Sequence, residues 1–264
     1  MKPNIALLAT GGTIASMKSE RGLIPGMNAA EIIKNSGRIS EIADVVPVDV
    51  FNLDSSNVQP EEWQLLAQAV RNISDSVDGI VITHGTDTMA YTASALSFML
   101  YDIDKPIVLT GSQLPMNFPF SDAAVNLEEA FSFASKAKSG VYVVFHHKVI
   151  FGTRAVKMRT LSYDAFDSIN LPPFAIFNAE GLRLSKQSLP SWSEKLNIIN
   201  PDLIDSKVFL LKLIPGTNPE IFDCLVNSGY KGVVIEAFGL GGIHYMRRNL
   251  IDKLNLLSDL NIPV

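Results

Sequence analysis

The sequence predicts an α/β fold, with a doubly wound parallel sheet in an N-terminal domain and a smaller α/β domain at the C-terminus. Its 264 residues exceed a typical single domain of about 100–200 residues, so a large domain and a smaller one are expected. Short, continuous apolar runs recur along the chain, as is typical of strands buried on both faces of a parallel sheet. Amphipathic helical patterns lie between these runs, and this alternation is typical of a doubly wound sheet.

Six apolar runs are predicted to be strands. They are Ile5–Ala9, Gly79–Thr83, Pro106–Thr110, Val141–Phe145, Val208–Leu213 and Val233–Ile235. A helix is predicted from Pro60, which suits the first helical position, because an apolar stripe follows at Trp63, Leu66, Ala67 and Val70. Two further stripes predict helices, one at Met89, Ala93, Leu96 and Leu100 and one at Ala124, Leu127, Phe131 and Ala134.

The strand–helix pattern fails around residues 178–206, which are polar and irregular. We therefore expect an N-terminal domain over residues 1–177, a linker over 178–206 and a C-terminal α/β domain over 207–264. In this last domain, Asn218 is expected to cap a helix that Pro219 opens, and another helix is lined by Leu250, Ile251, Leu254 and Leu257. The chain ends where the next strand should begin, so we expect an incomplete, truncated domain that either pairs with another chain or lacks its C-terminal end.

Composition and charge exclude several classes of protein. Hydrophobic residues make up 47% and charged residues 19%, which excludes intrinsic disorder. The formal net charge of −5 argues against nucleic-acid binding, which usually needs a basic face. The single cysteine, Cys224, excludes an intramolecular disulfide and a cysteine-rich zinc site. Because no apolar run approaches the roughly 18 residues of a membrane span and no signal peptide is evident, we expect a cytoplasmic protein without membrane contact.

Three predicted strands end in glycine and small polar residues, in the segments Thr10–Thr13, Thr83–Thr88 and Thr110–Gln113. Ligands of open parallel sheets bind beyond the carboxyl ends of the strands, and glycines let the backbone approach a ligand closely. One such turn alone is most simply a helix cap. A phosphate cradle is disfavoured, because neither a P-loop lysine nor a complete GxGxxG motif follows. Three hydroxyl-rich turns together favour an active site.

Thr13 is the candidate nucleophile, because its β-branched side chain restricts the orientation of its hydroxyl. Such a hydroxyl needs a base. Thr86 and Asp87 can place a second hydroxyl and a carboxylate in the same cleft, and a desolvated lysine such as Lys157 is a candidate base. No serine–histidine–acid arrangement is evident in the sequence.

The remaining polar candidates are expected to have structural roles. His146 and His147 are predicted to lie next to each other on a strand and to point to opposite faces, so they cannot readily share a ligand. Cys224 lies at helical spacing among apolar residues and is expected to pack in the core. No metal or organic cofactor is expected, since the proposed residues can hydrolyse an amide without one.

Five segments resemble the bacterial-type L-asparaginases, and the cytoplasmic type I branch is the nearest. The segments are ATGGTIAS (9–16), LDSSN (53–57), VITHGTDTMAYTASALSFML (81–100), LTGSQLP (109–115) and RAVKMRTLSYDAFDSINLPP (154–173). The similarity runs through essentially the whole chain, and the pair TGGTIA and HGTDTM at this separation is highly specific. The resemblance implies an L-asparaginase, a hydrolase that converts L-asparagine to L-aspartate and ammonia.

By this resemblance, Thr13 looks like the nucleophile that forms a β-aspartyl ester. Thr86, Asp87 and Lys157 resemble the family's relay of hydroxyl, carboxylate and lysine, which assists proton transfer and the attack of water. The resemblance leaves open which threonine performs which half-reaction.

The resemblance also implies the residues that bind the substrate. Ser55 matches the serine that binds the α-carboxylate, helped by the flanking Asp54 and Ser56. Asp87 matches the residue that pairs with the α-ammonium, and Ser112, through its backbone, matches the residue next to the leaving amide. A zwitterion needs an anion receptor and a carboxylate at a fixed spacing, so this set is physically coherent.

Two features depart from the family pattern. Many members carry a tyrosine on the mobile loop after the first strand, and this position is Leu23 here, which we treat as variation and not as inactivation. Gly22 and Gly26 flank it and keep the loop mobile, as a lid requires. The second departure is the C-terminus, because relatives continue for several tens of residues. The resemblance implies a homodimer or homotetramer with active sites between subunits, so a chain ending at Val264 is expected to fold incompletely, assemble poorly or have little activity.

Two alternatives stand beside hydrolysis of asparagine. Asparaginase-like subunits of tRNA-dependent amidotransferases release ammonia for use on a charged tRNA. They carry an additional domain before the first glycine turn, for which a turn beginning at residue 10 leaves no room. The other alternative is a truncated, catalytically impaired protein that binds an amino acid. The intact motif residues argue against it; they are Thr13, Ser55, Thr86, Asp87 and Lys157.

Overall fold

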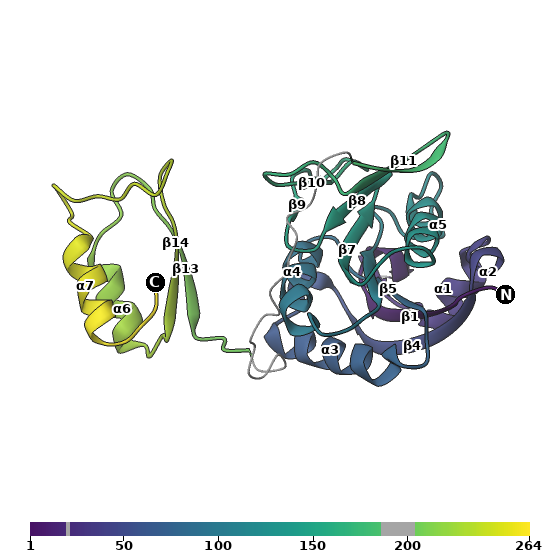
Figure 1. Cartoon of the computed structure of the whole chain (residues 1–264), viewed down its shortest axis with the longest axis horizontal. Coiled ribbons are helices and arrows are strands. Elements are labelled where there is room, and N and C mark those ends of the chain that lie inside the picture. The colour runs from purple at the N-terminus through teal and green to yellow at the C-terminus, as the bar shows by residue number, and fades with distance from the viewer. Residues whose placement is uncertain (20–21, 186–203) are drawn as a thin grey trace. The chain divides into compact units, whose positions relative to one another are not determined.

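The computed structural model describes residues 1–19, 22–185 and 204–264 of the chain. The chain divides into two compact units, Met1–Leu203 and Ile204–Val264 (Figure 1). Most of the predicted linker, residues 186–203, lies outside the described residues. Residues 181–184, near the start of the predicted linker, were expected to be irregular, and this expectation is wrong. They form strand β12 (Gly181–Leu184), because their backbone pairs with the preceding strand of the first unit.

The first unit is built on an eight-stranded sheet with the strand order β12-β11-β8-β7-β6-β5-β1-β4. Its other strands are β1 (Asn4–Gly11), β4 (Asp44–Leu53), β5 (Gly79–Thr83), β6 (Pro106–Thr110), β7 (Gly140–Phe145), β8 (Lys148–Phe151) and β11 (Ala175–Asn178). Neighbouring strands from β4 to β7 are parallel, whereas β8, β11 and β12 add to the sheet in antiparallel pairs. The predicted parallel sheet is therefore confirmed as the centre of a larger mixed sheet.

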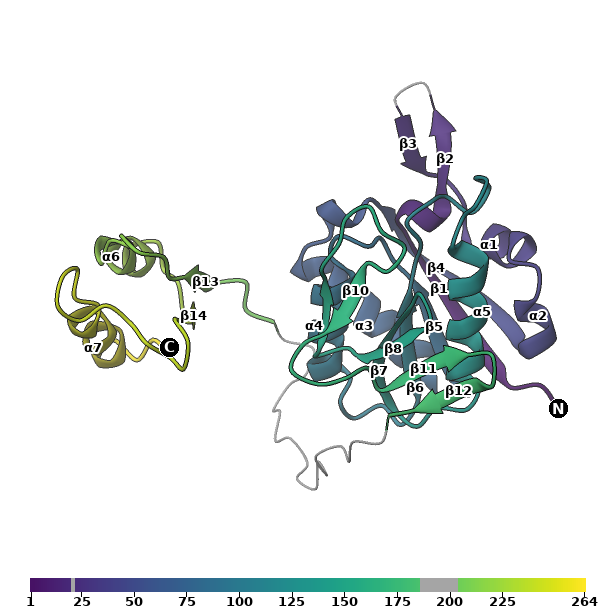
Figure 2. The same cartoon turned by 90° about the horizontal axis from the view of Figure 1, so that it is seen from above.

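Helices cover both faces of this sheet (Figure 2). On one face lie α1 (Ala29–Asn35), α2 (Ile39–Ile42) and α5 (Ala123–Ala134), and on the other lie α3 (Pro60–Ser74) and α4 (Met89–Met99). In β1, Ile5 and Leu7 belong to the core cluster on the α5 side, and the alternate residues Ala6 and Leu8 are equally buried. Both faces of the central strands are covered, which explains the continuous apolar runs and confirms the doubly wound prediction.

Two short antiparallel hairpins extend from the sheet. The first, β2 (Ser16–Ser19) with β3 (Gly22–Pro25), follows β1. The second, β9 (Ala155–Lys157) with β10 (Phe166–Ser168), lies between β8 and β11 in the chain. Neither hairpin was predicted from the sequence, because each strand has only three or four residues.

The prediction that His146 and His147 lie on a strand is wrong. Both residues have positive φ, 45° and 65°, and form the turn between β7 and β8. A two-residue hairpin turn of type I′ has positive φ at both central positions, and histidine tolerates this better than bulky or β-branched residues. The two rings lie with their centroids 5.0 Å apart and their planes tilted by 41°, instead of pointing to opposite faces. Their backbone N–H groups donate to Asn126 and Glu129 of α5, in agreement with a structural role.

The second unit contains a pair of parallel strands and two helices. The strands are β13 (Val208–Lys212) and β14 (Gly232–Glu236), and the helices are α6 (Glu220–Asn227) and α7 (Ile251–Asp259). Helix α6 begins at Glu220, one residue later than predicted, with Pro219 in the cap position, and the side-chain Oδ1 of Asn218 accepts a hydrogen bond from the N–H of Glu220. The core of this unit includes Leu211, Phe222 and Leu257. Cys224 on α6 is exposed, so its predicted place in the core is wrong. In the described parts of the chain, no helix combines the length and the apolar character that a membrane span requires.

Candidate active site

Four turns begin at the same edge of the parallel sheet. The register aligns the strand ends, because Gly11 pairs with Leu53, Ala9 with Thr83 and Thr83 with Thr110. The turn after β1 continues into the 3₁₀ helix η1 (Thr13–Ala15), and the turn after β4 continues into η2 (Ser55–Asn57). All predicted site residues except Lys157 follow directly after one of these strands, at the edge where open α/β sheets bind their ligands.

Two of the turns pack backbone against backbone. A Cβ atom added to Gly12 would lie 2.4 Å from the backbone N of Gly85, and one added to Gly85 would lie 2.5 Å from Ser55 Oγ. Real Cβ atoms do not approach so closely, so both positions require glycine. Thr13 and Thr86 follow these two glycines directly. The two threonines therefore start from a common point of contact, although 73 positions separate them in the sequence.

The contact between the two turns can be tested with Gly12→Ala. This variant is expected to lose about 2–4 kcal/mol of folding free energy, because the methyl group would overlap Gly85 and because φ at Gly12 is +77°. Gly37→Ala is the matched control, since Gly37 has φ of +67° but open space around its Cβ position. It should lose only the backbone cost of about 1–2 kcal/mol. Equal losses in chemical denaturation would contradict the close packing of the turns.

Lys157 is brought to Thr86 and Asp87 by strand β9. Its ammonium Nζ donates to Thr86 Oγ1 at 2.8 Å and to Asp87 Oδ1 at 2.6 Å. Thr86 is buried and the Lys157 side chain is only 15% exposed, whereas the Asp87 side chain is 61% exposed. The cluster thus has a desolvated hydroxyl and lysine on the inside and an accessible carboxylate on the outside.

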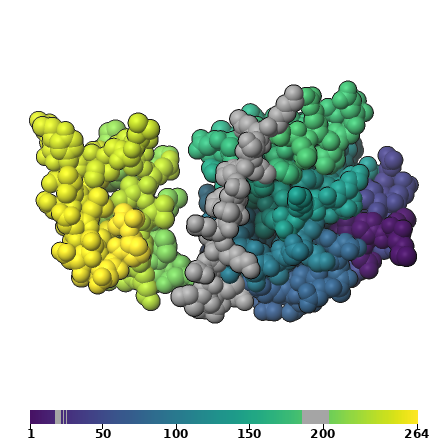
Figure 3. Space-filling model, in the orientation of Figure 1, coloured from purple at the N-terminus to yellow at the C-terminus, as the bar shows by residue number. Residues whose placement is uncertain are grey.

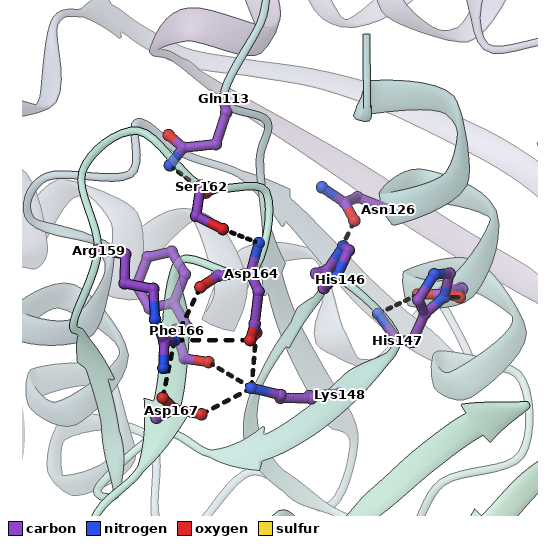
Figure 4. Close-up of polar contacts among 11 residues, drawn as sticks. Gln113, Asn126, His146, His147, Lys148, Arg159, Ser162, Asp164, Phe166 and Asp167 are labelled. Atoms are coloured by element: carbon purple, nitrogen blue, oxygen red, sulfur yellow. Dashed lines mark hydrogen bonds and ion pairs between the residues drawn. The ribbon is translucent and has the colours of Figure 1, made fainter. Parts of the chain in front are cut away.

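Gln113 is a residue of this site that the sequence analysis did not single out. Its Nε2 donates to the carbonyl oxygens of Thr160 and Ser162, and its Oε1 accepts from Thr86 Oγ1 at 3.5 Å (the Ser162 contact is drawn in Figure 4). Gln113 therefore links Thr86 to the loop after Lys157. The sequence offered one indication of this role, because Gln113 lies in the polar segment Thr110–Gln113 that follows β6.

Ser55 is held at the start of η2 by its neighbours. Asp54 Oδ1 accepts hydrogen bonds from the backbone N–H of Ser56 at 2.9 Å and from Ser56 Oγ at 2.7 Å, and these bonds lower the pKa of Asp54. The Ser55 carbonyl accepts from Thr88 Oγ1 at 2.7 Å, which joins the turn after β4 to the turn after β5. Asp54 and Ser56 thus shape the turn that presents the buried Ser55 beside Gly85.

Ser112 is buried, and its hydroxyl donates to the carbonyl of Leu114 at 2.5 Å. Its own side chain therefore closes the turn after β6. This geometry is compatible with the expected contribution of Ser112 through its backbone. The carboxylate of Asp122 fixes the same turn by accepting from the N–H groups of Gln113 and Leu114.

Thr13 and Leu23 belong to the segment after β1. Thr13 is half-buried at the first position of η1, and Ser16 Oγ donates to the carbonyl of Gly12 at 3.0 Å, which closes the turn. Leu23 pairs through its backbone with Lys18 in the β2–β3 hairpin, so the position predicted to lie on a lid is on β3, ten positions after the candidate nucleophile.

His84, between Thr83 and Gly85, is fully buried and hydrogen-bonded on both ring nitrogens. Nδ1 lies 2.8 Å from the carbonyl of Gly85 and therefore carries the proton, so Nε2 accepts from Thr92 Oγ1 at 3.0 Å. Trp63 Nε1 donates in turn to Thr92 Oγ1 at 3.0 Å. Burial lowers the pKa of His84 to about 4, outweighing the hydrogen bond to Gly85, so the ring is neutral at pH 7 and supports the turn after β5.

The burial of neutral His84 predicts a pH-dependent stability. Since the folded pKa of about 4 lies below the ordinary 6.5, the stabilisation is complete above pH 6.5 and is lost as the pH falls towards 4. This loss amounts to roughly 3 kcal/mol. Denaturant unfolding of the wild type and of His84→Gln at pH 7 and 4.5 measures it. The variant should show the smaller pH dependence, and identical pH dependences would refute the assignment.

In the described ranges, no group of three or more histidine, cysteine, aspartate or glutamate side chains is arranged to hold a metal ion. The chemistry that the arrangement offers is that of hydroxyls, a lysine, a carboxylate and the backbone N–H groups of glycine turns.

Comparison with protein families matches both units. The family model "Asparaginase, N-terminal" matches residues 4–190, and the family model "Glutaminase/Asparaginase C-terminal domain" matches residues 207–264. The chain is 42% identical to the L-asparaginase of Thermococcus kodakarensis over 252 residues, which cover 95% of this chain and 76% of that protein. It is also 41% identical over 254 residues to a glutamyl-tRNA(Gln) amidotransferase subunit of Pyrococcus abyssi, covering 90% of this chain and 57% of its relative. It thus spans less than two thirds of that relative.

Solved structures agree with these matches. The thermostable L-asparaginase from T. kodakarensis superposes with a TM-score of 0.85 at 40% identity, covering 97% of this chain and 77% of that one. A probable cytoplasmic L-asparaginase from Campylobacter jejuni also gives a TM-score of 0.85, at 29% identity, and covers 99% of this chain and 81% of its own.

Proposed function

Because the chain belongs to the asparaginase family, we propose that it hydrolyses the side-chain amide of L-asparagine to L-aspartate and ammonia through an acyl-enzyme on Thr13. The observation that carries the proposal is the contact of Lys157 Nζ with Thr86 Oγ1 and Asp87 Oδ1. These side chains come from distant parts of the sequence and meet beside the turn that bears Thr13. This contact supports a proton relay and a charged group for an amino acid at the edge of the sheet that bears the candidate nucleophile.

In the first step, Thr13 Oγ attacks the side-chain carbonyl carbon of asparagine. The C–N bond breaks, and the leaving nitrogen takes up a proton equivalent to the one that the hydroxyl gives up, so that ammonia and a β-aspartyl ester form. Backbone N–H groups at the glycine turns are the candidates for stabilising the oxyanion.

In the second step, a water molecule attacks the ester carbonyl and the ester C–O bond breaks. One proton of the water returns to Thr13 Oγ and aspartate leaves. Thr86 suits a relay role in this step, because its hydroxyl accepts from Lys157 and can donate in turn.

Substrate specificity follows from the charges at the two ends of the amino acid. We propose that Ser55, at the start of η2, binds the α-carboxylate, and that the exposed carboxylate of Asp87 pairs with the α-ammonium. Asp54 and Ser56 hold η2 in the geometry for this contact. Ser112 contributes through its backbone next to the leaving amide.

Ammonia release by the full chain from L-asparagine, with L-glutamine as the comparison substrate, tests this function. Release that depends on Thr13 supports it, and no release from either substrate would refute it. Calorimetric binding of L-aspartate without any hydrolysis of L-asparagine would point instead to an amino-acid-binding protein.

We also propose that the chain belongs to the cytoplasmic type I branch and assembles as a homodimer or homotetramer. Its similarity over 99% of its length to the probable cytoplasmic enzyme of C. jejuni supports the branch assignment. Sedimentation velocity measures the assembly, and a purely monomeric chain would contradict that part of the proposal.

A second candidate function is that of an amidotransferase component that supplies ammonia for a charged tRNA. The 41% identity to the P. abyssi protein favours it. A shift assay with tRNA distinguishes the two functions, because the net charge of −5 predicts no shift for a free-standing asparaginase.

A further inference from the structure

Four charged side chains form a cluster beside the β9–β10 hairpin (Figure 4). The cluster consists of Lys148 on β8, Arg159 and Asp164 in the loop between β9 and β10, and Asp167 on β10. The loop and β10 belong to the segment 150–185, which Figure 3 shows in green at the surface of the first unit. None of these residues has a role in the hydrolysis described above.

Lys148 makes three contacts with its ammonium group. Nζ lies 2.6 Å from Asp164 Oδ1, 2.6 Å from Asp167 Oδ1 and 3.2 Å from the carbonyl oxygen of Phe166. An ammonium has three N–H donors, so these contacts use all of them. Burial alone would lower the pKa of Lys148, but the two carboxylates outweigh it and raise the pKa, so the group stays charged across the ordinary pH range.

Arg159 closes the cluster from the other side. Its Nη1 donates to the carbonyl of Asp164 at 2.9 Å and to Asp167 Oδ2 at 3.0 Å. Two cations thus balance two carboxylates. Removing Lys148 alone would leave Asp164 and Asp167 facing each other with a single cation, and like charges at this spacing repel.

The cluster is connected to Lys157 through a single strand pair. Phe166, whose carbonyl Lys148 binds, is the residue directly opposite Lys157 in the β9–β10 register. The ring of Phe166 is buried against Phe145 at the end of β7, with ring centroids 5.0 Å apart. On the other side of Lys157, the N–H groups of Met158 and Arg159 donate to the carbonyl of Ala165.

Phe166 and Lys148 attach the hairpin to the sheet, and Gln113 holds its loop through the carbonyls of Thr160 and Ser162. Strand β9 is only three residues long. A short hairpin of this kind has little stability by itself, so its position depends on these attachments. A shift of the β10 backbone would move Lys157 with it and change the 2.6–2.8 Å contacts with Thr86 and Asp87.

We propose that Lys148 is a positioning residue, which fixes the ammonium of Lys157 against Thr86 and Asp87 by binding Asp164, Phe166 and Asp167 at once. The inference deepens the proposed function and rests on it for its catalytic consequence. The placement of Lys157 itself can be tested without turnover.

The test uses three variants of the full chain. Lys148→Met removes the charge at similar length, and Lys148→Arg restores a cation. Lys253→Met is the matched control, because Lys253 in the second unit is similarly exposed and binds both oxygens of Asp223 at 2.6 Å. If Lys148→Met does not fold, Asp167→Asn is the milder substitute, since it leaves Lys148 bound to Asp164.

The first readout is the rate at which acetic anhydride labels Lys157, measured by competitive labelling and peptide mass spectrometry. Lys148→Met is expected to raise this rate about fivefold or more, and Asp167→Asn about twofold. Lys148→Arg and Lys253→Met should leave it within about twofold of the wild type. An unchanged rate in Lys148→Met, or an equal rise in Lys253→Met, would overturn the proposal.

The second readout is turnover of L-asparagine. Lys148→Met should lower kcat by about 10- to 100-fold with a smaller effect on KM, and Lys148→Arg should restore most of it. In a Lys157→Ala background, Lys148→Met should cause no further loss, because it acts through that residue. A wild type without activity would refute the proposed function, while the labelling rates would still decide for or against the positioning role.

Discussion

Thr13→Ala is expected to release ammonia from L-asparagine at least about 10³-fold more slowly than the wild type, with an unchanged fold. The variant keeps the glycine contact that positions the turn, since Gly12 and Gly85 are untouched. It loses the side-chain oxygen of residue 13, on which the proposed ester forms. The loss should therefore fall on kcat, and L-aspartate should still bind, because Ser55 and Asp87 remain. Steady-state kinetics and calorimetry of the same preparation measure both quantities.

Thr13→Ser is the control for this prediction. It keeps a hydroxyl but loses the β-branched methyl group that restricts its orientation, so we expect partial activity, well above that of Thr13→Ala. If Thr13→Ala turns over asparagine at the wild-type rate while Thr86→Ala does not, the roles assigned to the two threonines are reversed.

Lys157→Met is expected to lower kcat by about 10²–10⁴-fold, the range in which proton transfer by a positioned side chain contributes. Methionine is similar in length, but it can donate neither to Thr86 Oγ1 nor to Asp87 Oδ1. Among the described residues, the hydroxyl of Thr86 then keeps the long contact with Gln113. Asp87 loses its counter-ion at a site where the lysine is largely buried, so the two groups no longer share a proton path.

Lys157→Arg should restore little activity, because a guanidinium cannot give up a proton as a lysine can and holds its donors in a planar fork. Lys253→Met serves again as the matched control and should retain the wild-type kcat. Wild-type turnover in Lys157→Met would exclude the relay, and full rescue by arginine would reduce the role of Lys157 to that of a positive charge.

Strands covered on both faces could be predicted from the sequence, and strands at the edges could not. β5 and β6 are entirely buried, so their apolar runs are continuous and unmistakable. β4 lies at the edge, alternates between exposed and partly buried residues and contains Pro47, so no continuous run marks it. The antiparallel extension begins at a turn of two histidines with positive φ, a turn that usually contains glycine or asparagine and gave no signal here.

The candidate site could be predicted to the extent that it follows the strand ends. Thr13, Thr86 and Asp87 stand in turns whose glycines and hydroxyls are visible in the sequence. Lys157 is 70 positions from Asp87 and lies on a three-residue strand, so only the family resemblance distinguished it from other lysines. Gln113 and Lys148 act through individual hydrogen bonds and ion pairs to residues elsewhere in the sequence. Such contacts leave no periodic pattern in the chain.

The central claim is that the hydroxyl of residue 13 becomes acylated at the edge of the sheet where residues 55, 86, 87 and 157 are gathered. Rapid acid quenching of the full chain during turnover of L-asparagine, followed by peptide mass spectrometry, tests it directly. We expect an aspartyl group on the peptide that contains Thr13, and none in Thr13→Ala. An aspartyl group on the peptide that contains Thr86, with Thr13 unmodified, would contradict it.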